Sequence, residues 1–265
     1  MALRTILAFV RCSHPEPVVA VSAVAGALAL SAGRGAGTVW VVLAVLAGQL
    51  YVGWSNDYVD RDLDRAEGRR DKPIAAGQVE ARAVGIASLV ALVAAVPLSL
   101  ASGPAAALVH LGALGSASAY NLGLKRNLFS AIPYAVSFSM VPAFVTLGLP
   151  HAHWPPLWVM IAAGLIGVGG HFAQARPDVN RDRVQGVIGL PQLAGDRLSA
   201  ITAAAFLAAG AAVIAAGAHS LIPLVAVVPV PIVVLAKPVA AYRLTLLIVG
   251  LTVGAFLLNG GSLAG

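Results

Sequence analysis

Apolar runs alternate with short polar or Pro/Gly-rich segments along the whole chain. Nine runs are long enough to cross a hydrocarbon core of about 30 Å as helices. They cover residues 17–33, 37–59, 83–101, 104–122, 129–149, 156–177, 198–217, 220–236 and 243–260. The pattern predicts an all-α polytopic membrane protein with nine transmembrane helices in a single integral-membrane domain over residues 1–265.

Composition supports membrane lipid as the natural solvent, because 59% of the residues are hydrophobic and only 11% are charged. The single cysteine, Cys12, cannot form an internal disulfide, and no Cys/His spacing indicates zinc or haem. The net charge of +6 comes without a basic stripe interleaved with aromatic residues, so we expect no nucleic-acid partner.

The charges are distributed unevenly between the two sides of the predicted topology. If the N-terminus is cytoplasmic, every Lys and Arg except Arg34 falls on the cytoplasmic side, as the positive-inside rule requires. All 11 acidic residues fall on that side too, which the rule does not require. We therefore expect the N-terminus and the active-site loops in the cytoplasm, with the chemistry at that membrane surface.

A shift of 118 positions aligns the two longest cytoplasmic loops without a gap. Asp60 then falls on Asp178 and Asp64 on Asp182. The further identities pair Arg65 with Arg183, Gly68 with Gly186, Pro73 with Pro191, Ala76 with Ala194 and Gly77 with Gly195. We interpret this as two parallel four-helix halves plus a ninth helix. The alternative is a chance alignment of Gly, Pro and Ala.

The first loop carries Asn56, Asp57, Asp60 and Asp64, whose last three members share one helical face at spacings of three and four. Ionised carboxylates on one stripe repel one another unless a cation lies between them. Oxygen ligands of this kind suit Mg²⁺, which is usually completed by water and substrate phosphate. Asp62 lies off the face.

The second loop repeats the spacing with Gln174, Asp178 and Asp182. Two facing stripes would offer oxygen ligands to divalent cations from both sides. An alternative interpretation is a solvated, self-neutralising helix end, because the first aspartates alternate with Arg61 and Arg65.

The motifs NDxxDxxxD from Asn56 and DxxxD from Asp178 resemble the paired signatures of the UbiA superfamily of intramembrane prenyltransferases. The likeness extends to residues 70–77, to Tyr120 followed by Lys125 and Arg126, and to Arg11 with His14-Pro15. It implies a nine-helix bundle around a central cavity, Mg²⁺-dependent loss of diphosphate from an allylic prenyl donor, and capture of the carbocation. Gln174, in place of an acidic residue or Asn, departs from the pattern, as does the five-residue step from Tyr120 to Lys125.

Combined with this resemblance, the motifs assign catalytic roles. We assign one metal to Asn56, Asp57, Asp60 and Asp64, and the other to Asp178 and Asp182. The diphosphate-binding candidates are Lys125, Arg126, Arg70, Lys72, Arg11 and Arg176, each of which could instead be a positive-inside anchor.

Cavity candidates continue the two stripes into the membrane. They are Gln49, Gly53, Tyr51, Trp54, Tyr120, His171 and Gln174. Aromatic faces among them could stabilise a cation, or they could be interfacial belt residues. Gly53 could instead serve close helix packing, and His171 could be a structural histidine.

The leading functional prediction is transfer of a prenyl group to an aromatic, quinone-precursor-like acceptor in a bacterial cytoplasmic membrane. A UbiA-type terpene cyclase would use the same ionisation but no external acceptor. A cation transporter is the third alternative, but no Asp, Glu, Lys or Arg lies in the middle of a predicted span.

Overall fold

The structure is a computed structural model that describes residues 2–184, 186–258 and 263. Across those residues the chain is helical and contains no strand. The α-helices are α1 (Ala2–Cys12), α2 (Pro15–Ser31), α3 (Thr38–Ala66), α4 (Ala81–Leu100), α5 (Pro104–Leu122), α6 (Ile132–Thr146), α7 (Leu157–Ala175), α8 (Val179–Val184), α9 (Leu190–Gly217), α10 (Val230–Leu235) and α11 (Pro238–Leu258). Three short 3₁₀ helices complete them: η1 (Gly35–Gly37), η2 (Leu124–Arg126) and η3 (Ile222–Val227).

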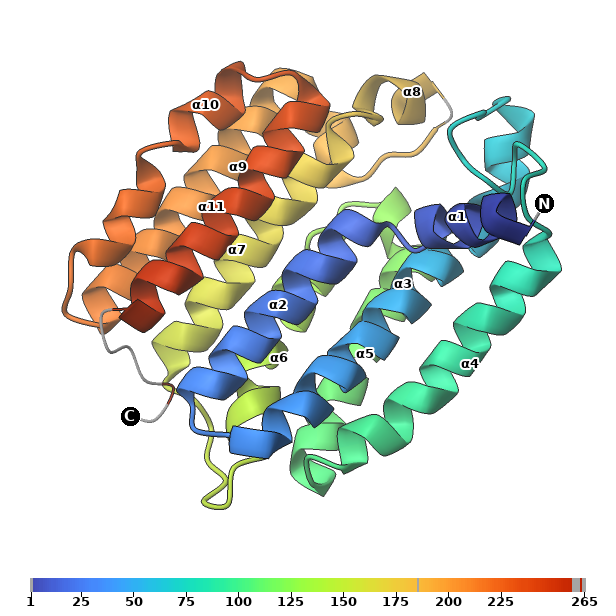
Figure 1. Ribbon diagram of the computed structural model, residues 1–265. Helices are drawn as coiled ribbons and strands as arrows, with labels where there is room; N and C mark the ends of the chain where they lie inside the picture. The colour runs from blue at the N-terminus through green and yellow to red at the C-terminus, as the bar shows by residue number, and fades with distance from the viewer. Residues whose placement is uncertain (1, 185, 259–262, 264–265) are drawn as a thin grey trace.

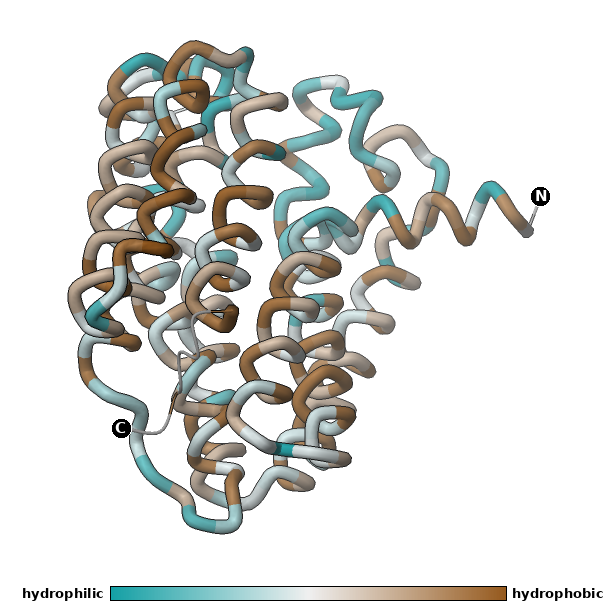
Figure 2. Tube along the Cα trace, turned by 60° about the vertical axis from the view of Figure 1, so that its left-hand side comes forward, coloured by the Kyte–Doolittle hydropathy of each residue, from teal (hydrophilic) through white to brown (hydrophobic). Residues whose placement is uncertain are grey.

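Long apolar helices make this an integral membrane protein. Five helical segments in the described chain have the length and apolar composition of membrane spans: 35–66, 81–100, 157–175, 190–217 and 238–258. Shorter apolar helices occupy 15–31, 132–146 and 222–235. Hydrophilic residues gather at one end of the molecule, which we call the polar end (Figure 2). Over the described residues each predicted run coincides with helical structure, and residues 259–260 of the last run lie outside them. The number of nine membrane crossings stays a prediction.

The element order agrees with the internal repeat. Shifted by 118 positions, α3 coincides with α7 plus α8, and α4 coincides with most of α9. The end of α3 and the short helix α8, which carry aspartates of the two motifs, lie at the same end of the molecule (Figure 1). The corresponding helices α3 and α7 therefore both end near the polar end, while the division into two parallel four-helix halves stays a prediction.

The helices differ from the predicted spans in three places, two of which contain a proline. Helix α3 continues to Ala66, beyond the predicted end at residue 59, so its aspartates are helical. Helix α7 stops at Ala175, and Pro177 separates it from α8 because proline cannot donate the helical hydrogen bond. The predicted span 220–236 is broken into η3 and α10 around Pro229.

Small residues allow the backbones to approach closely near the polar end. A side chain on Gly53 of α3 would overlap the backbone carbonyl of Ser13, which links α1 to α2. His14 turns the chain there with φ 56° and ψ 69°, in the left-handed region. The α1–α2 connection is thus pressed against the middle of α3.

Candidate active site

Both aspartate motifs open onto one cavity of about 310 Å³ at the polar end. Helix α3 contributes Asn56, Asp60 and Asp64, because a spacing of four keeps them on one helical face. The second half contributes Gln174, Asp178 and Asp182. Residues more than a hundred positions apart in sequence therefore share one polar chamber.

The second motif reaches the cavity without forming a continuous helical stripe. Gln174 is on α7, Asp178 is in the turn after it, and Asp182 is on α8. The helix is interrupted at Pro177, between Gln174 and Asp178, yet all three side chains line the cavity. Gln192 at the start of α9 donates a hydrogen bond from Nε2 to Asp182 Oδ2 at 2.7 Å.

Two basic side chains of η2 face these carboxylates. Lys125 Nζ lies 2.5 Å from Asp60 Oδ2 and 3.2 Å from Asn56 Oδ1, and Arg126 lies 3.4 Å from Asp60 Oδ1. Burial lowers the pKa of Lys125, although the Asp60 charge opposes that effect. Both basic residues line the cavity.

Arg69 joins the two aspartate loops. Its guanidinium pairs with Asp71 at 2.6 Å and with Asp178 at 3.4 Å. The hydrogen bond with Asp71 raises the pKa of Arg69, and the same contact lowers the pKa of Asp71 to about 2. This side chain therefore fixes the loop after α3 against the start of the second motif.

Asp57 differs from the other motif aspartates because it does not line the cavity. It is 1% exposed, and its Oδ1 lies 2.7 Å from Lys72 Nζ and 2.9 Å from His14 Nε2. Burial alone would lower the pKa of Lys72, but the charge and hydrogen bond of Asp57 outweigh it and raise that pKa. Asp57 thus ties the loop after α3 and the α1–α2 connection to α3, while Lys72 lines the cavity.

Deeper in the membrane the cavity wall becomes aromatic. Tyr120 and Tyr134 meet edge to face with ring centroids 5.1 Å apart, and Phe138 stacks with Tyr134 at 6.3 Å. The Tyr134 hydroxyl donates to Gln174 Oε1 at 2.8 Å. Tyr134, Phe138 and Gln174 also line a second, largely apolar cavity of about 260 Å³ between α2, α6, α7 and α11.

Sequence comparison decides the family. Residues 19–247 match the UbiA prenyltransferase family. The chain belongs to this family. Curated proteins include no match to the sequence.

Solved structures of UbiA homologues share the fold at low sequence identity. A UbiA homolog from Archaeoglobus fulgidus bound to GPP and Mg²⁺ is 17% identical, with a TM-score of 0.68 over 96% of this chain and 98% of that chain. The apo UbiA homolog from Aeropyrum pernix K1 is 18% identical, with a TM-score of 0.72 over 92% and 98%. A digeranylgeranylglyceryl phosphate synthase structure is 14% identical, with a TM-score of 0.67 over 97% and 99%.

Three predicted diphosphate ligands of this UbiA chain lie outside the cavity lining. Arg70 is exposed to solvent, and its neighbour Arg69 takes the cavity position instead. Arg11 bonds the Gln78 side chain and the Asp71 carbonyl. Arg176 is buried, 2.8 Å from Asp196, and donates to the Val233 carbonyl. Arg11 and Arg176 are engaged by these other partners and Arg70 is exposed, so the three lie outside the residues that line the cavity.

Three predicted cavity residues also lie behind the wall. The Tyr51 hydroxyl bonds Ser118 Oγ at 2.5 Å, and Trp54 Nε1 donates to the Phe9 carbonyl. His171 is 2% exposed, bonds Ser130 Oγ at 3.1 Å and packs against Tyr134. Gln49, Gly53, Tyr120 and Gln174 line the cavity.

Sequence reasoning missed Arg69, Tyr134 and Gln192 as cavity residues. Arg69 and Arg70 are adjacent and chemically identical, so no pattern distinguishes them. Tyr134 and Gln192 come from other helices and reach the cavity only through tertiary packing. His14 also lines the cavity. The one sequence feature that pointed to it is its place close to Arg11 in the opening segment that resembles the UbiA family.

The donor set suits a metal that is completed by its substrate. Among the described residues, no three His, Cys, Asp or Glu side chains converge on one ready-made metal site. Asp60, Asp64, Asp178 and Asp182 nevertheless supply only hard oxygen donors to one chamber. Burial, with the charges of Asp178 and Glu67, raises the pKa of Asp182, so a cation there would relieve unfavourable ionisation. Such a site fits Mg²⁺, which retains water and phosphate ligands.

Proposed function

We propose that this chain is a Mg²⁺-dependent prenyltransferase that ionises a prenyl diphosphate and transfers the prenyl group to an aromatic, quinone-precursor-like acceptor. The observation that carries the proposal is one chamber in which carboxylates from both halves meet basic side chains and border an apolar cavity. Family membership and the homologue bound to GPP and Mg²⁺ support it.

The carboxylates would hold two metal ions. We assign Asn56, Asp60 and Asp64 to one ion and Asp178 and Asp182 to the other, with Asp57 as a positioning residue. Bound Mg²⁺ would act as a Lewis acid that stabilises the negative charge developing on the leaving diphosphate. Gln192 would orient Asp182 through its 2.7 Å hydrogen bond.

Lys125, Arg126, Lys72 and Arg69 would bind the diphosphate oxygens. Lys125 and Arg126 contact Asp60 at 2.5 and 3.4 Å, so they neutralise the carboxylate that the metal would occupy. Metal binding at Asp60 would release these cations toward the incoming anion. The side chains of Lys125, Lys72 and Arg69 are only 10–16% exposed, which strengthens each charge-assisted bond because less water competes for it.

The prenyl tail would occupy the apolar part of the chamber. Its wall excludes the water that would quench a carbocation, and the faces of Tyr120, Tyr134 and Phe138 can stabilise positive charge. An acceptor placed beside these rings would capture the cation before solvent does.

The direct test is incubation of purified protein with Mg²⁺ and prenyl diphosphates of increasing length, with and without aromatic acceptors. Diphosphate release that depends on an acceptor, together with a prenylated product, supports transfer. Release without an acceptor, with a cyclic hydrocarbon or alcohol as product, would assign the terpene cyclase activity instead. Absence of release with every donor would refute both.

Matched variants test the residue assignment. Asp60→Asn and Asp178→Asn should each lower turnover by about a hundredfold or more, the scale for losing one preorganised electrostatic contact to developing charge. Asp62→Asn is the control, because Asp62 is 69% exposed and does not line the cavity. Unchanged turnover in both Asp60→Asn and Asp178→Asn, with normal thermal stability, would defeat the metal assignment.

A further inference from the structure

Helix α1 carries apolar side chains on two opposite faces. Ala8 and Cys12 face inward and are buried with Ile74, Val79 and Val84. The outward face repeats apolar residues at spacings of three and four, and their side chains are 46–68% exposed. This outward stripe consists of Leu3, Ile6, Leu7 and Val10. Water is an unfavourable neighbour for four adjacent aliphatic side chains.

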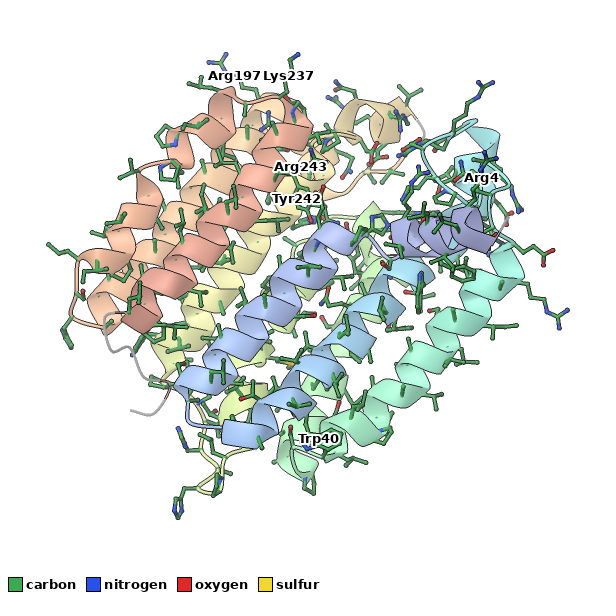
Figure 3. All side chains as sticks on the ribbon, viewed as in Figure 1. Arg4, Trp40, Arg197, Lys237, Tyr242 and Arg243 are labelled. Atoms are coloured by element: carbon green, nitrogen blue, oxygen red, sulfur yellow. The ribbon has the colours of Figure 1, made fainter. Side chains whose placement is uncertain are left out.

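The helix lies at the polar end and points away from the bundle. Figures 1 and 2 show α1 leaving the top of the bundle sideways, across the direction of α2 and α3. Arg4 of α1 lies at the same end as Arg197 and Lys237, opposite Trp40 (Figure 3). This is the level at which an integral membrane protein meets the headgroup layer.

Basic side chains occupy one flank of the helix between its two apolar faces. Arg4 and Arg11 are seven residues apart, about two turns, so they share that flank. Arg11 is tied to the loop after α3 through Gln78 and Asp71, whereas Arg4 is exposed in the first turn of α1. A basic flank beside an apolar stripe complements anionic headgroups above acyl chains.

The neighbouring surface supports a lipid partner over a protein one. The inward face of α1 packs against Val84 in the first turn of α4. Beyond that turn α4 exposes Ile86, Leu89, Val90 and Val93, an apolar face that lipid must cover in an integral membrane protein. Helix α1 therefore contacts, through its inward face, the helix that presents this lipid-facing surface.

We propose that α1 is an interfacial helix that lies in the headgroup layer of an anionic membrane. The outward stripe faces the acyl chains, and Arg4 contacts lipid phosphates. The same helix leads directly into Ser13 and His14, which line the catalytic cavity. Lipid contact at α1 thus anchors one wall of the site to the membrane surface.

Spin labels on introduced cysteines test this in the full chain reconstituted into nanodiscs. Cys12 is 0% exposed, and burial raises its pKa to about 12, so the native cysteine stays unlabelled. A label at Leu7→Cys should be relaxed more strongly by oxygen than by a water-soluble nickel chelate. Glu80→Cys, at an exposed position before α4, is the aqueous control and should show the reverse.

Two results would overturn the proposal. Nickel access at Leu7→Cys equal to that at Glu80→Cys would place the stripe in water. Low access to both reagents, with dipolar broadening between labels, would place a second copy of the chain on it. The role of lipid charge is tested separately. Adding phosphatidylglycerol to phosphatidylcholine nanodiscs should increase the depth of the Leu7→Cys label in the membrane, and Arg4→Gln should remove that increase. A depth insensitive to both would refute the anionic contact.

Discussion

Asp57→Asn should destabilise the fold without abolishing the metal site. Asp57 and Lys72 form a buried pair at 2.7 Å, with side chains 2% and 16% exposed. Removing one partner of a buried pair costs about 3–5 kcal/mol, because the other charge stays buried without compensation. The Asp64 charge still acts on Lys72, so we expect the lower limit, about 3 kcal/mol. For a chain of this size that corresponds to a fall of about 6–12 °C in Tm.

The sole cysteine provides the assay. Cys12 is buried beside Asp57, so a fluorogenic maleimide reports when the α1–α3 contact opens on heating. Tryptophan fluorescence in parallel separates local opening from global unfolding. Asp62→Asn makes the same chemical change on the same helix at an exposed position, where ion pairs contribute about 0–1 kcal/mol.

The metal requirement distinguishes a positioning residue from a ligand. In activity assays at a temperature where all variants are folded, Asp57→Asn should keep a near-normal Mg²⁺ midpoint, whereas Asp60→Asn should raise it. A Tm for Asp57→Asn equal to that of Asp62→Asn would refute the buried-pair reasoning. A Mg²⁺ midpoint raised as much as in Asp60→Asn would make Asp57 a ligand.

Three further predictions follow from single contacts. Native Cys12 should resist iodoacetamide at pH 8 and react only after denaturation, because burial raises its pKa to about 12; labelling of the native protein seen by mass spectrometry would contradict this. Gly53→Ala should cost about 1–3 kcal/mol in thermal stability because its methyl would overlap the Ser13 carbonyl, and an unchanged Tm would argue against that approach. We also expect the Mg²⁺ midpoint to rise as pH falls. If Asp182 binds the metal as proposed, its raised pKa means that the carboxylate is protonated at a higher pH than an ordinary aspartate would be. A midpoint independent of pH would contradict this, and Asp182→Asn should flatten the dependence.

Much of the architecture follows from local chemistry. A helix is the simplest way for a single apolar run to satisfy its backbone in lipid, so run length alone indicates where helices form. The 118-residue repeat adds their common direction, and the spacing of Asn56, Asp60 and Asp64 places them on one face of α3. Run length and aspartate spacing depend on residues within a few turns, whereas the repeat compares two distant segments of the sequence. The helix bounds and the cavity lining of α3 agree with these inferences.

Only the tertiary structure shows which charged side chains near the loops face the cavity. Asp57 and Asp60 are three residues apart and lie on one side of α3, yet Asp57 meets Lys72 and His14 while Asp60 meets the chamber. The partners of Asp57 come from segments that fold back over α3. Sequence spacing does not record such long-range contacts. For the same reason it did not show that Arg69, and not its neighbour Arg70, lines the cavity.

Composition, run length and aspartate spacing by themselves determined a helical membrane protein with two acidic motifs, because lipid solvation and helical periodicity act locally. Only the tertiary structure decided which charges face the cavity and which hold the scaffold together. That choice depends on which distant segment packs against each helix face, as the Ser13 carbonyl does at Gly53.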